Sequence, residues 1–486
     1  MLSLAEILSA LADTAARFPV ERWRINGVHV WPLVRYEVAS WNFELTARPA
    51  AATRARGRAQ QLRAFASAAK RAPREIVPRR ADVLVYSDGV SYLRVPSGNY
   101  DRFADPVRAF AADRGLTTRV LIPHHQYATT GAASTFVQPA VDAVQLVAAL
   151  ASRLRSREQT ELPEFAAAMD TLRQHGATRL PSVEVLGRTV SQLEVHARAL
   201  DLVLGLMQPR VALLPSYIGT ERMALALACR RRGIPCVDIQ HGAAGETHWA
   251  YGGFGRAPRG GYELMPSRFW CWTREDAAAI ERWADRADHA AIVAGAPMVQ
   301  AWRRGLVPGV ETARSELDAR CARPRPQTCF ILSGYETDAT LDAYVACVKS
   351  SPRRFFWFRT HPLRHAQAEA IEQRLEAQGL RDRAEVALST RAPLYALFER
   401  VEQLVLELSS SAYEAALFGV PSLVISESTA KVYADLARAG LVSHAPPDVL
   451  AQRLSGMKQA PPAWGPDESE IERGLEQLFA PSAQRA

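Results

Sequence analysis

Short apolar runs that alternate with helix-like segments constrain the fold of this chain more than any other feature. Runs that end in turn residues lie at residues 81–89, 119–123, 211–216, 236–240, 269–272 and 290–295. Helical periodicity fills much of the sequence between them, most clearly at residues 190–206 and 221–231. Strands that alternate with helices predict a parallel sheet with helices on both of its faces.

The same pattern restarts after Gly295. Further apolar runs lie at residues 328–333, 355–360, 384–388, 401–408 and 422–426. A chain of 486 residues, 48% of them hydrophobic, is too long for one domain of usual size. The sequence therefore predicts an α/β fold with two doubly wound domains facing a cleft, at 81–295 and 296–486, after a helical and basic extension at 1–80.

The formal net charge of +8 gathers in that extension, within residues 48–80. The basic residues there are Arg48, Arg54, Arg56, Arg58, Arg63, Lys70, Arg71, Arg74, Arg79 and Arg80, against Glu75 alone. Such a stretch attracts an anionic membrane surface, a nucleic acid or a phosphorylated acceptor, or it is simply a solvated helix. Nucleic-acid binding is not expected, because the stretch has no series of interleaved aromatic residues.

Other features of composition limit the class of protein. The spacing of Leu4, Ile7, Leu8 and Leu11 predicts an amphipathic helix rather than a secretory signal. There is no uninterrupted apolar run of about 18 residues, so no membrane-spanning helix is expected. The six cysteines lack zinc-like spacing and are expected to be buried, reduced thiols. We therefore expect a cytoplasmic protein without a metal, and peripheral contact with the inner face of the cytoplasmic membrane is a further hypothesis.

Three serines follow the run at 401–408. Ser409, Ser410 and Ser411 come just before a predicted helix, and Glu414 lies on its first turn. Hydroxyls and N–H groups at a strand-to-helix turn favour a phosphate, although serine there also caps helices. Glu414 would bond ribose hydroxyls or simply favour the helix dipole.

Two other strand ends of the second domain carry polar residues. His361 and Pro362 follow the run at 355–360, which contains Arg359 near its end. Proline makes the turn rigid, and a guanidinium group supplies charge for a phosphate, although Arg359 could equally pair with a carboxylate such as Glu407. Ser333 and Gly334 close the run at 328–333 and form another loop that could contact a diphosphate.

In the first domain, candidate bases lie at strand ends. His241 follows the run at 236–240, with Gly242 after it and Glu246 close behind. Asp88 ends the run at 81–89, where turn formation by Asp-Gly is the simpler explanation. The chain has no G-x-x-x-x-G-K-[ST], G-x-S-x-G or H-E-x-x-H motif, so P-loop, serine-hydrolase and zinc-protease functions lose support.

With these residues in view, the chain resembles the GT-B glycosyltransferases that build bacterial surface polysaccharides. It is similar to capsule-type Kdo transferases, to bacterial sialyl- and polysialyltransferases, and to teichoic-acid glycerophosphotransferases. The resemblance covers roughly residues 235–430 and is carried by the segment at 238–242, the His361-Pro362 pair, and the serine run and helix at 409–421. The segment at 31–35 also looks like the leader of other surface-carbohydrate proteins.

This resemblance implies two Rossmann-like domains and assigns roles to the motif residues. His361, Ser409, Ser410 and Ser411 would bind a cytidine nucleotide and its phosphate. His241 would act at the transfer centre, as base or phosphate ligand. The acidic-acidic-Gly motif of bacterial sialyltransferases is only partly matched at 87–89, so the base stays open between Asp88, His241 and Glu246.

The function expected from this resemblance is transfer of a sugar from a nucleotide-activated donor to a surface-polysaccharide or glycolipid acceptor. The donor would be a CMP-linked sugar of the Kdo or sialic-acid type, bound by the second domain without a metal or other cofactor. A CDP-glycerol-type glycerophosphotransferase, a nucleotide-sugar 2-epimerase and a non-catalytic glycan-assembly scaffold are the alternatives. The sugar, the linkage, the acceptor and the oligomeric state are left open.

Overall fold

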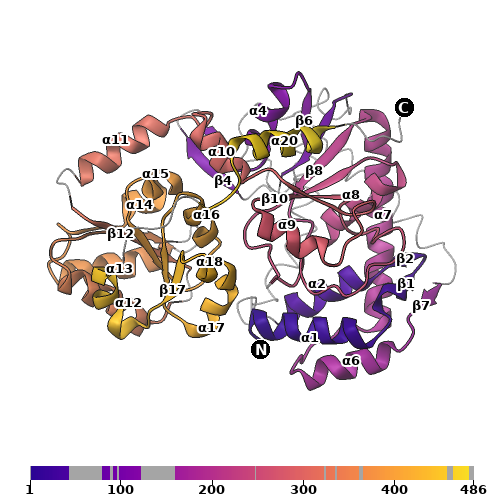
Figure 1. Ribbon diagram of the computed structural model, residues 1–486, viewed down its shortest axis with the longest axis horizontal. Helices are drawn as coiled ribbons and strands as arrows, with labels where there is room; N and C mark the ends of the chain where they lie inside the picture. Colours follow the sequence, from indigo (N-terminus) through magenta and orange to yellow (C-terminus); the bar gives the residue numbers. More distant parts are fainter. Residues whose placement is uncertain are drawn as a thin grey trace, which may run out of the picture. The chain divides into compact units, whose positions relative to one another are not determined.

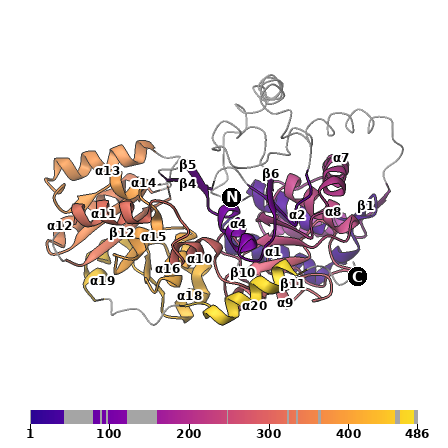
Figure 2. The same cartoon turned by 90° about the horizontal axis from the view of Figure 1, so that it is seen from above.

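The chain divides into two compact units (Figures 1 and 2). The first comprises Met1–Tyr92, Gly98–Met298 and Pro466–Ala486, and the second comprises Leu93–Ser97 and Val299–Gly465. The computed structural model describes residues 2–42, 79–87, 91–95, 98–121, 159–246, 248–321, 325–333, 336–360, 365–456 and 464–480. The predicted α/β class with two Rossmann-like units is confirmed by the two sheets below. The cleft between them stays a prediction.

The first unit is built on a six-stranded parallel sheet. In spatial order its strands are β11 (Ala290–Val293), β10 (Arg268–Cys271), β9 (Cys236–Ile239), β8 (Val211–Pro215), β3 (Val83–Tyr86) and β6 (Thr118–Leu121). Every apolar run predicted between residues 81 and 295 therefore contains a strand.

Both faces of this sheet are covered by helices, which explains why its strands are apolar throughout. Leu84 and Leu214 belong to the core with α7 (Val183–Met207) and α8 (Thr220–Arg231). Val85 and Leu213 belong to the opposite core, with α4 (Ala104–Ala112) and α20 (Glu468–Phe479). Neighbouring residues of one strand enter different cores because side chains alternate along a strand. The helices α6 (Phe165–Gln174) and α9 (Arg274–Glu281) complete the unit. The strand β5 (Gly98–Asp101) also belongs to it and forms a two-stranded sheet with β4 (Tyr92–Val95), most of which is assigned to the second unit.

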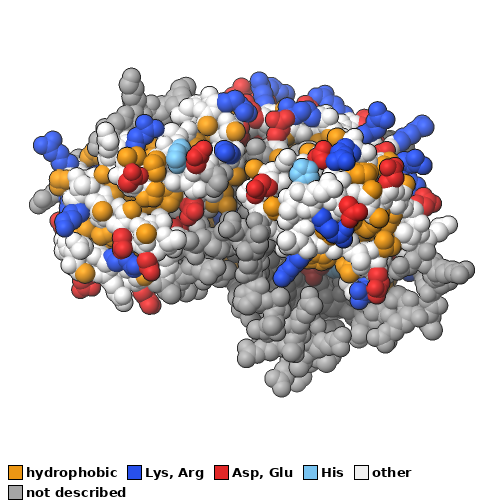
Figure 3. Space-filling model, turned by 90° about the horizontal axis from the view of Figure 1, so that it is seen from below, with side chains coloured by type: hydrophobic (Ala, Val, Ile, Leu, Met, Phe, Trp, Pro, Cys, Tyr) orange, Lys and Arg blue, Asp and Glu red, His pale blue; other side chains and the backbone are white. Residues whose placement is uncertain are grey.

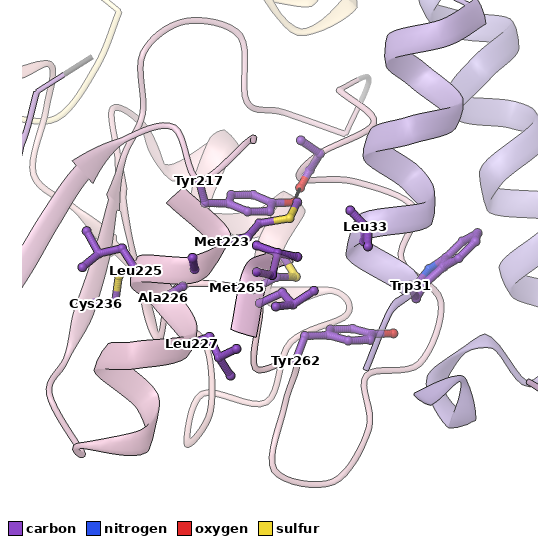
Figure 4. Close-up of a cluster of buried hydrophobic side chains, with 14 of the residues drawn as sticks. Trp31, Leu33, Tyr217, Met223, Leu225, Ala226, Leu227, Cys236, Tyr262 and Met265 are labelled. Carbon is purple, nitrogen blue, oxygen red and sulfur yellow. Dashed lines mark hydrogen bonds between the residues drawn. The ribbon is translucent and has the colours of Figure 1, made fainter. Parts of the chain in front are cut away.

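The described part of the predicted extension is packed into the first core. It contains α1 (Leu4–Arg17), α2 (Trp31–Asn42), β1 (Arg24–Ile25) and β2 (Val28–His29). The strand β1 pairs with β2 and with β7 (Thr160–Glu161), which comes later in the chain, in a small antiparallel sheet. Trp31 and Leu33 share a cluster with Tyr217, Tyr262 and Met265 (Figure 4). Because α1 and α2 bury their apolar faces in this cluster, they join the first unit instead of forming a separate segment.

The basic stretch at 48–80 lies outside the described residues, apart from the exposed Arg79 and Arg80. On the face drawn in Figure 3, basic and acidic side chains are mixed over the described surface. Within the described ranges, no helix combines the length and apolarity needed to cross a bilayer. None of the six cysteines is in a disulfide, and five of them are buried.

The second unit repeats the plan with another six-stranded parallel sheet. Its strands in spatial order are β14 (Ala384–Glu385), β13 (Phe355–Thr360), β12 (Gln327–Leu332), β15 (Gln403–Leu406), β16 (Ser422–Val424) and β17 (Val442–His444). Its principal helices are α10 (Pro297–Arg303), which begins at the end of the first unit, α11 (Val310–Arg320), α12 (Asp338–Ser350), α13 (His365–Ala377), α14 (Ala387–Arg391), α15 (Leu394–Phe398), α16 (Ser411–Leu417), α17 (Glu427–Ala430), α18 (Ala434–Arg438) and α19 (Leu450–Gly456).

Two elements differ from the sequence-based expectation. The run at 384–388 is a strand for two residues only, because the Glu385 carboxylate accepts the Leu388 N–H at 2.9 Å and starts α14 there. The edge strand β17 was not expected. Its neighbour β16 pairs Val424 with His444, so the sheet extends one strand further than the apolar runs indicated.

The last helix leaves the second unit. The sequence placed residues 296–486 in one domain, whereas α20 belongs to the first unit. Its apolar face, including Ile471 and Leu475, is buried in the core that also holds α4. The guanidinium of Arg268 on β10 donates to the carbonyls of Gln477 (2.9 Å) and Leu478 (3.2 Å) at the end of α20. Apolar burial and this cap of the C-terminal carbonyls hold the helix on the first sheet.

Candidate functional site

The strand order of the second sheet reverses between β12 and β15. From β12 the chain adds β13 and β14 on one side, and then returns to add β15, β16 and β17 on the other. Open parallel sheets bind ligands at the carboxyl ends of strands beside such a reversal. Ser333 follows β12 directly, and Ser409 to Ser411 follow β15. These two predicted turns therefore lie at neighbouring strand ends.

The serine turn after β15 is held by Tyr433. The Tyr433 hydroxyl accepts the Ser409 N–H at 2.7 Å and donates to the Ser409 carbonyl at 2.9 Å. The Ser409 hydroxyl donates to that of Ser411 at 3.0 Å. Ser411 is almost fully buried, whereas Ser410 is exposed. The bonds fix the backbone of the turn, so the Ser410 hydroxyl is presented from a rigid base.

The N–H groups of this turn are used differently from the sequence-based expectation. The Ser411 N–H donates to the Ser409 hydroxyl at 3.2 Å, and the Tyr413 N–H donates to the Ser410 carbonyl at 3.0 Å. Ser410 precedes α16, but its side chain makes no capping bond. Since the turn satisfies these N–H groups itself, it presents hydroxyl groups to a ligand instead of a row of unbonded N–H groups.

Two carboxylates lie near the end of β12. The Glu336 carboxylate accepts the N–H and the hydroxyl of Ser333, at 2.7 and 2.9 Å, and the amide of Gln367 at 2.7 Å. Burial, together with the charge of Glu336, raises the pKa of Glu407, which directly follows β15. Burial and both carboxylates raise the pKa of Tyr344, whose buried hydroxyl has no hydrogen-bond partner among the described residues. The reversal point is therefore lined by acceptors of hydrogen bonds as well as by hydroxyls.

Arg359 and Glu414 are tied into the second unit. The Arg359 guanidinium donates to the carbonyls of Ser389 at 2.7 Å and Ala392 at 2.5 Å, and so fixes the end of α14 to β13. The Glu414 carboxylate is only 5% exposed and accepts the Tyr395 hydroxyl at 2.5 Å. The Arg359 contacts thus join β13 to the end of α14, and the Glu414 contact joins α16 to α15.

Several predicted site residues lie outside the part of the chain that the structure describes. They are Asp88, Gly334, His361 and Pro362. Their predicted roles stay predictions. His361 directly follows β13, the neighbour of β12, so the sequence assigns it to the same sheet edge as the two serine turns.

In the first unit, His241 is an exposed residue directly beyond β9 and the buried Gln240. The Gln240 amide donates to the Gly242 carbonyl at 2.8 Å, and its oxygen accepts the Trp272 N–H at 2.7 Å. The glutamine thereby bridges the ends of β9 and β10. It fixes the step at which His241 leaves the sheet.

A second histidine, His248, was not among the predicted site residues. Burial, together with the charges of His241 and Arg35, lowers its pKa to about 3. Its Nδ1 accepts the Ala250 N–H at 3.2 Å, so the neutral ring carries its proton on Nε2. In the sequence, the only sign of this electrostatic interaction between His241 and His248 is their spacing of seven positions. The interaction itself depends on how the loop between the two histidines folds.

Asp238 lies inside the sheet three residues before His241. It is 1% exposed, and its Oδ1 has no hydrogen-bond partner among the described residues. Burial raises its pKa to about 7, against the opposing effects of Tyr251, the Tyr217 N–H and Arg222. A carboxyl group of this kind is close to half-protonated at neutral pH.

The other acidic residues of this edge are exposed. Glu246 forms a surface ion pair with Arg282. Glu221 lies in the first turn of α8, beside the point where the first sheet reverses its strand order, between β3 and β8. Its carboxylate accepts the Tyr86 hydroxyl at 2.9 Å. Sequence reasoning missed Glu221, because its position at the reversal follows from strand order alone. Within the described residues, no cluster of three or more potential metal ligands is present.

Comparison with known proteins gives loose structural likenesses. No protein family matches the chain, and no curated protein is significantly similar to it. Among solved structures, the S. aureus MnaA–UDP complex has 11% identity and a TM-score of 0.47, covering 82% of this chain and 95% of that one. The UDP-GlcNAc 2-epimerase from Neisseria meningitidis bound to UDP-GlcNAc has 11% identity and a TM-score of 0.46, with 82% and 94% covered. MurG of Acinetobacter baumannii has 11% identity and a TM-score of 0.41, with 84% and 96% covered. At these values, what those proteins bind says nothing about this chain.

Proposed function

We propose that this chain is a glycosyltransferase that moves a sugar from a nucleotide-activated donor to a surface-polysaccharide or glycolipid acceptor. The donor is a CMP-linked sugar of the Kdo or sialic-acid type, bound by the second unit, and the first unit binds the acceptor. The supporting observation is the pair of polar turns, at Ser333 and at Ser409 to Ser411, beside the reversal of strand order in the second sheet.

The groups at this edge match the parts of a nucleotide. Hydroxyls such as that of Ser410 donate to phosphate oxygens, and His361 supplies an imidazole from the neighbouring strand end. Glu336 and Glu407 are acceptors, suited to ribose hydroxyls or to the amino group of cytosine. In this proposal the phosphate lies towards the serines and away from the two carboxylates, since like charges repel.

Transfer needs a base for the acceptor and donors of hydrogen bonds for the leaving phosphate. The acceptor oxygen forms a bond to the anomeric carbon while the bond from that carbon to the phosphate oxygen breaks. The electron pair of that bond leaves with the nucleotide monophosphate, and the acceptor proton passes to a base. His241, an exposed imidazole on a fixed turn, is our proposed base.

The test is an assay of the purified chain with CMP-linked sugars and candidate acceptors, read by product mass and by donor affinity. Ser410→Ala should weaken donor binding by roughly tenfold or more, because a hydrogen bond to a charged group is lost. Ser350→Ala, at an exposed serine of α12 in the same unit, is the matched control and should leave affinity unchanged.

The remaining outcomes identify the competing functions. Epimerisation of a nucleotide sugar without any acceptor would indicate an isomerase. With CDP-glycerol as donor, release of CMP and transfer of glycerophosphate would indicate a glycerophosphotransferase. Glycan binding without nucleotide binding would indicate a scaffold. Each of these results contradicts the proposed sugar transfer.

A further inference from the structure

Arg35 is a fully buried arginine on α2, within the segment at 31–35 that the sequence singled out without a mechanism. Its guanidinium donates to backbone carbonyls of one loop of the first unit. Nε donates to Trp249 at 2.9 Å, Nη1 to Gly253 at 2.7 Å and Nη2 to Gly252 at 2.5 Å, and Nη2 also bonds Trp249. One planar fork therefore gathers three carbonyls that come from a single turn.

Aromatic rings enclose this guanidinium. The Phe254 ring centroid lies 4.1 Å from the Arg35 Cζ, and that of Trp31 lies 5.5 Å away. Burial lowers the pKa of Arg35 to about 10, so the group stays charged at neutral pH. A buried cation that donates to these carbonyls is matched to the backbone of this loop, because the carbonyl dipoles and the ring faces balance its charge.

The loop that Arg35 holds is the one that follows His241 and contains His248. The His248 N–H donates to the Gly245 carbonyl at 3.0 Å, and the His248 carbonyl accepts the N–H groups of Tyr251 and Gly252. Gly252 is needed here, since a Cβ at this position would lie 2.4 Å from the Glu246 carbonyl oxygen. The turn around His248 is thus closed by short backbone bonds, and Arg35 ties its far side to α2.

We propose that Arg35 is a positioning residue, which holds the turn at 248–253 so that His248 stays a neutral imidazole with its proton on Nε2 beside His241. The consequence for catalysis depends on the proposed function. In sugar transfer the Nε2–H of His248 is a fixed neutral donor next to the base. The structural part of the proposal, the state of His248, stands independently of any activity.

The wild-type chain provides the first test. NMR of labelled histidine side chains should show one His248 ring with a single Nε2–H tautomer that does not titrate above about pH 4. Ordinary titration of His248 near pH 6.5 would overturn the proposal. This measurement needs neither a substrate nor a variant, so it does not fail if the transferase assignment fails.

Two variants separate charge from geometry. Arg35→Lys keeps the charge but loses the fork, and Arg35→Gln loses both. Both should give mixed His248 tautomers and raise the pH at which the ring titrates, with the larger change in Arg35→Gln. The control, Arg17→Gln on the exposed side of α1, should leave His248 unchanged. An unaltered His248 spectrum in folded Arg35→Lys would contradict the proposal.

Kinetics then test the link to function. If the chain is a transferase, Arg35→Lys should lower kcat on the order of tenfold to a hundredfold and leave the donor Kd unchanged, because the donor binds the second unit. An equal loss in donor affinity and turnover would show a general folding defect and would remove the positioning role.

Discussion

Asp238 connects the stability of the first unit to pH. The pKa of its buried carboxyl is about 7 in the folded chain, above the value of 3.8 expected when unfolded. Protonation of this group therefore favours the folded state. Its stabilising effect is complete below about pH 3.8 and is lost as pH rises through about 7.

Asp238→Asn should remove this dependence. The difference of about three pKa units corresponds to roughly 4 kcal/mol, which the wild type loses between about pH 4 and pH 7 and the amide does not. Thermal unfolding across this range should show the variant gaining stability relative to wild type as pH rises. The control is Glu161→Gln on the exposed strand β7, whose curve should follow wild type. Parallel curves for Asp238→Asn and wild type would show that Asp238 ionises normally.

The candidate site residues fall into two groups. A local sequence pattern places the residues of the first group, whereas those of the second depend on the folded structure. The positions of His241, Ser333 and Ser410 could be predicted, because each lies just beyond the end of an apolar strand, and strand ends are visible in the sequence. Glu336 and His248 could not be predicted, because their roles depend on which strands are neighbours and on bonds within a loop. The same holds for Arg35, which acts on a loop more than 200 positions away.

At the scale of elements, α20 shows how a helix far along the chain can complete an earlier sheet. Gly474 lies where this helix meets the end of β11. A Cβ at this position would lie 2.0 Å from the Val293 carbonyl oxygen and 2.8 Å from the Ala294 Cβ. The close approach of helix and backbone therefore requires glycine.

Gly474→Ala should destabilise the first unit by about 1–3 kcal/mol, since the helix must move away from the sheet. Glu476→Ala, two positions further on the exposed side of α20, is the matched control and should stay close to wild type. The measurement is urea unfolding of both variants. Equal urea midpoints for Gly474→Ala and the control would show that α20 does not lie in close contact with the end of β11.

Strands that are buried on both faces could be predicted from the sequence. The location of a helix such as α20, which depends on tertiary contacts, could not. Apolar runs such as 211–216 and 328–333 show their strands directly, since nearly every residue is buried. The location of α20 could not be read from local sequence. Its apolar face fits any exposed sheet, and only packing with α4 and β11 selects the first unit.

At the scale of the whole molecule, the chain repeats one design twice. Each unit has a six-stranded parallel sheet with a reversal of strand order, between β3 and β8 in the first and between β12 and β15 in the second. The reversal in the second unit carries hydroxyls and hydrogen-bond acceptors, whereas the first unit presents imidazoles and an exposed carboxylate. Because of this difference, we propose that the second unit binds the donor and that the first unit binds the acceptor.

Hydrogen–deuterium exchange of the full chain, with and without a saturating CMP-linked sugar, tests the assignment of the donor most directly. The account predicts slower exchange in peptides that contain Ser333 and Ser409 to Ser411, because a bound nucleotide would restrain both turns of the second sheet. Peptides of α20 should exchange at the same rate in both samples. No protection in the second unit, or protection confined to the first, would contradict the claim that this sheet edge binds the donor.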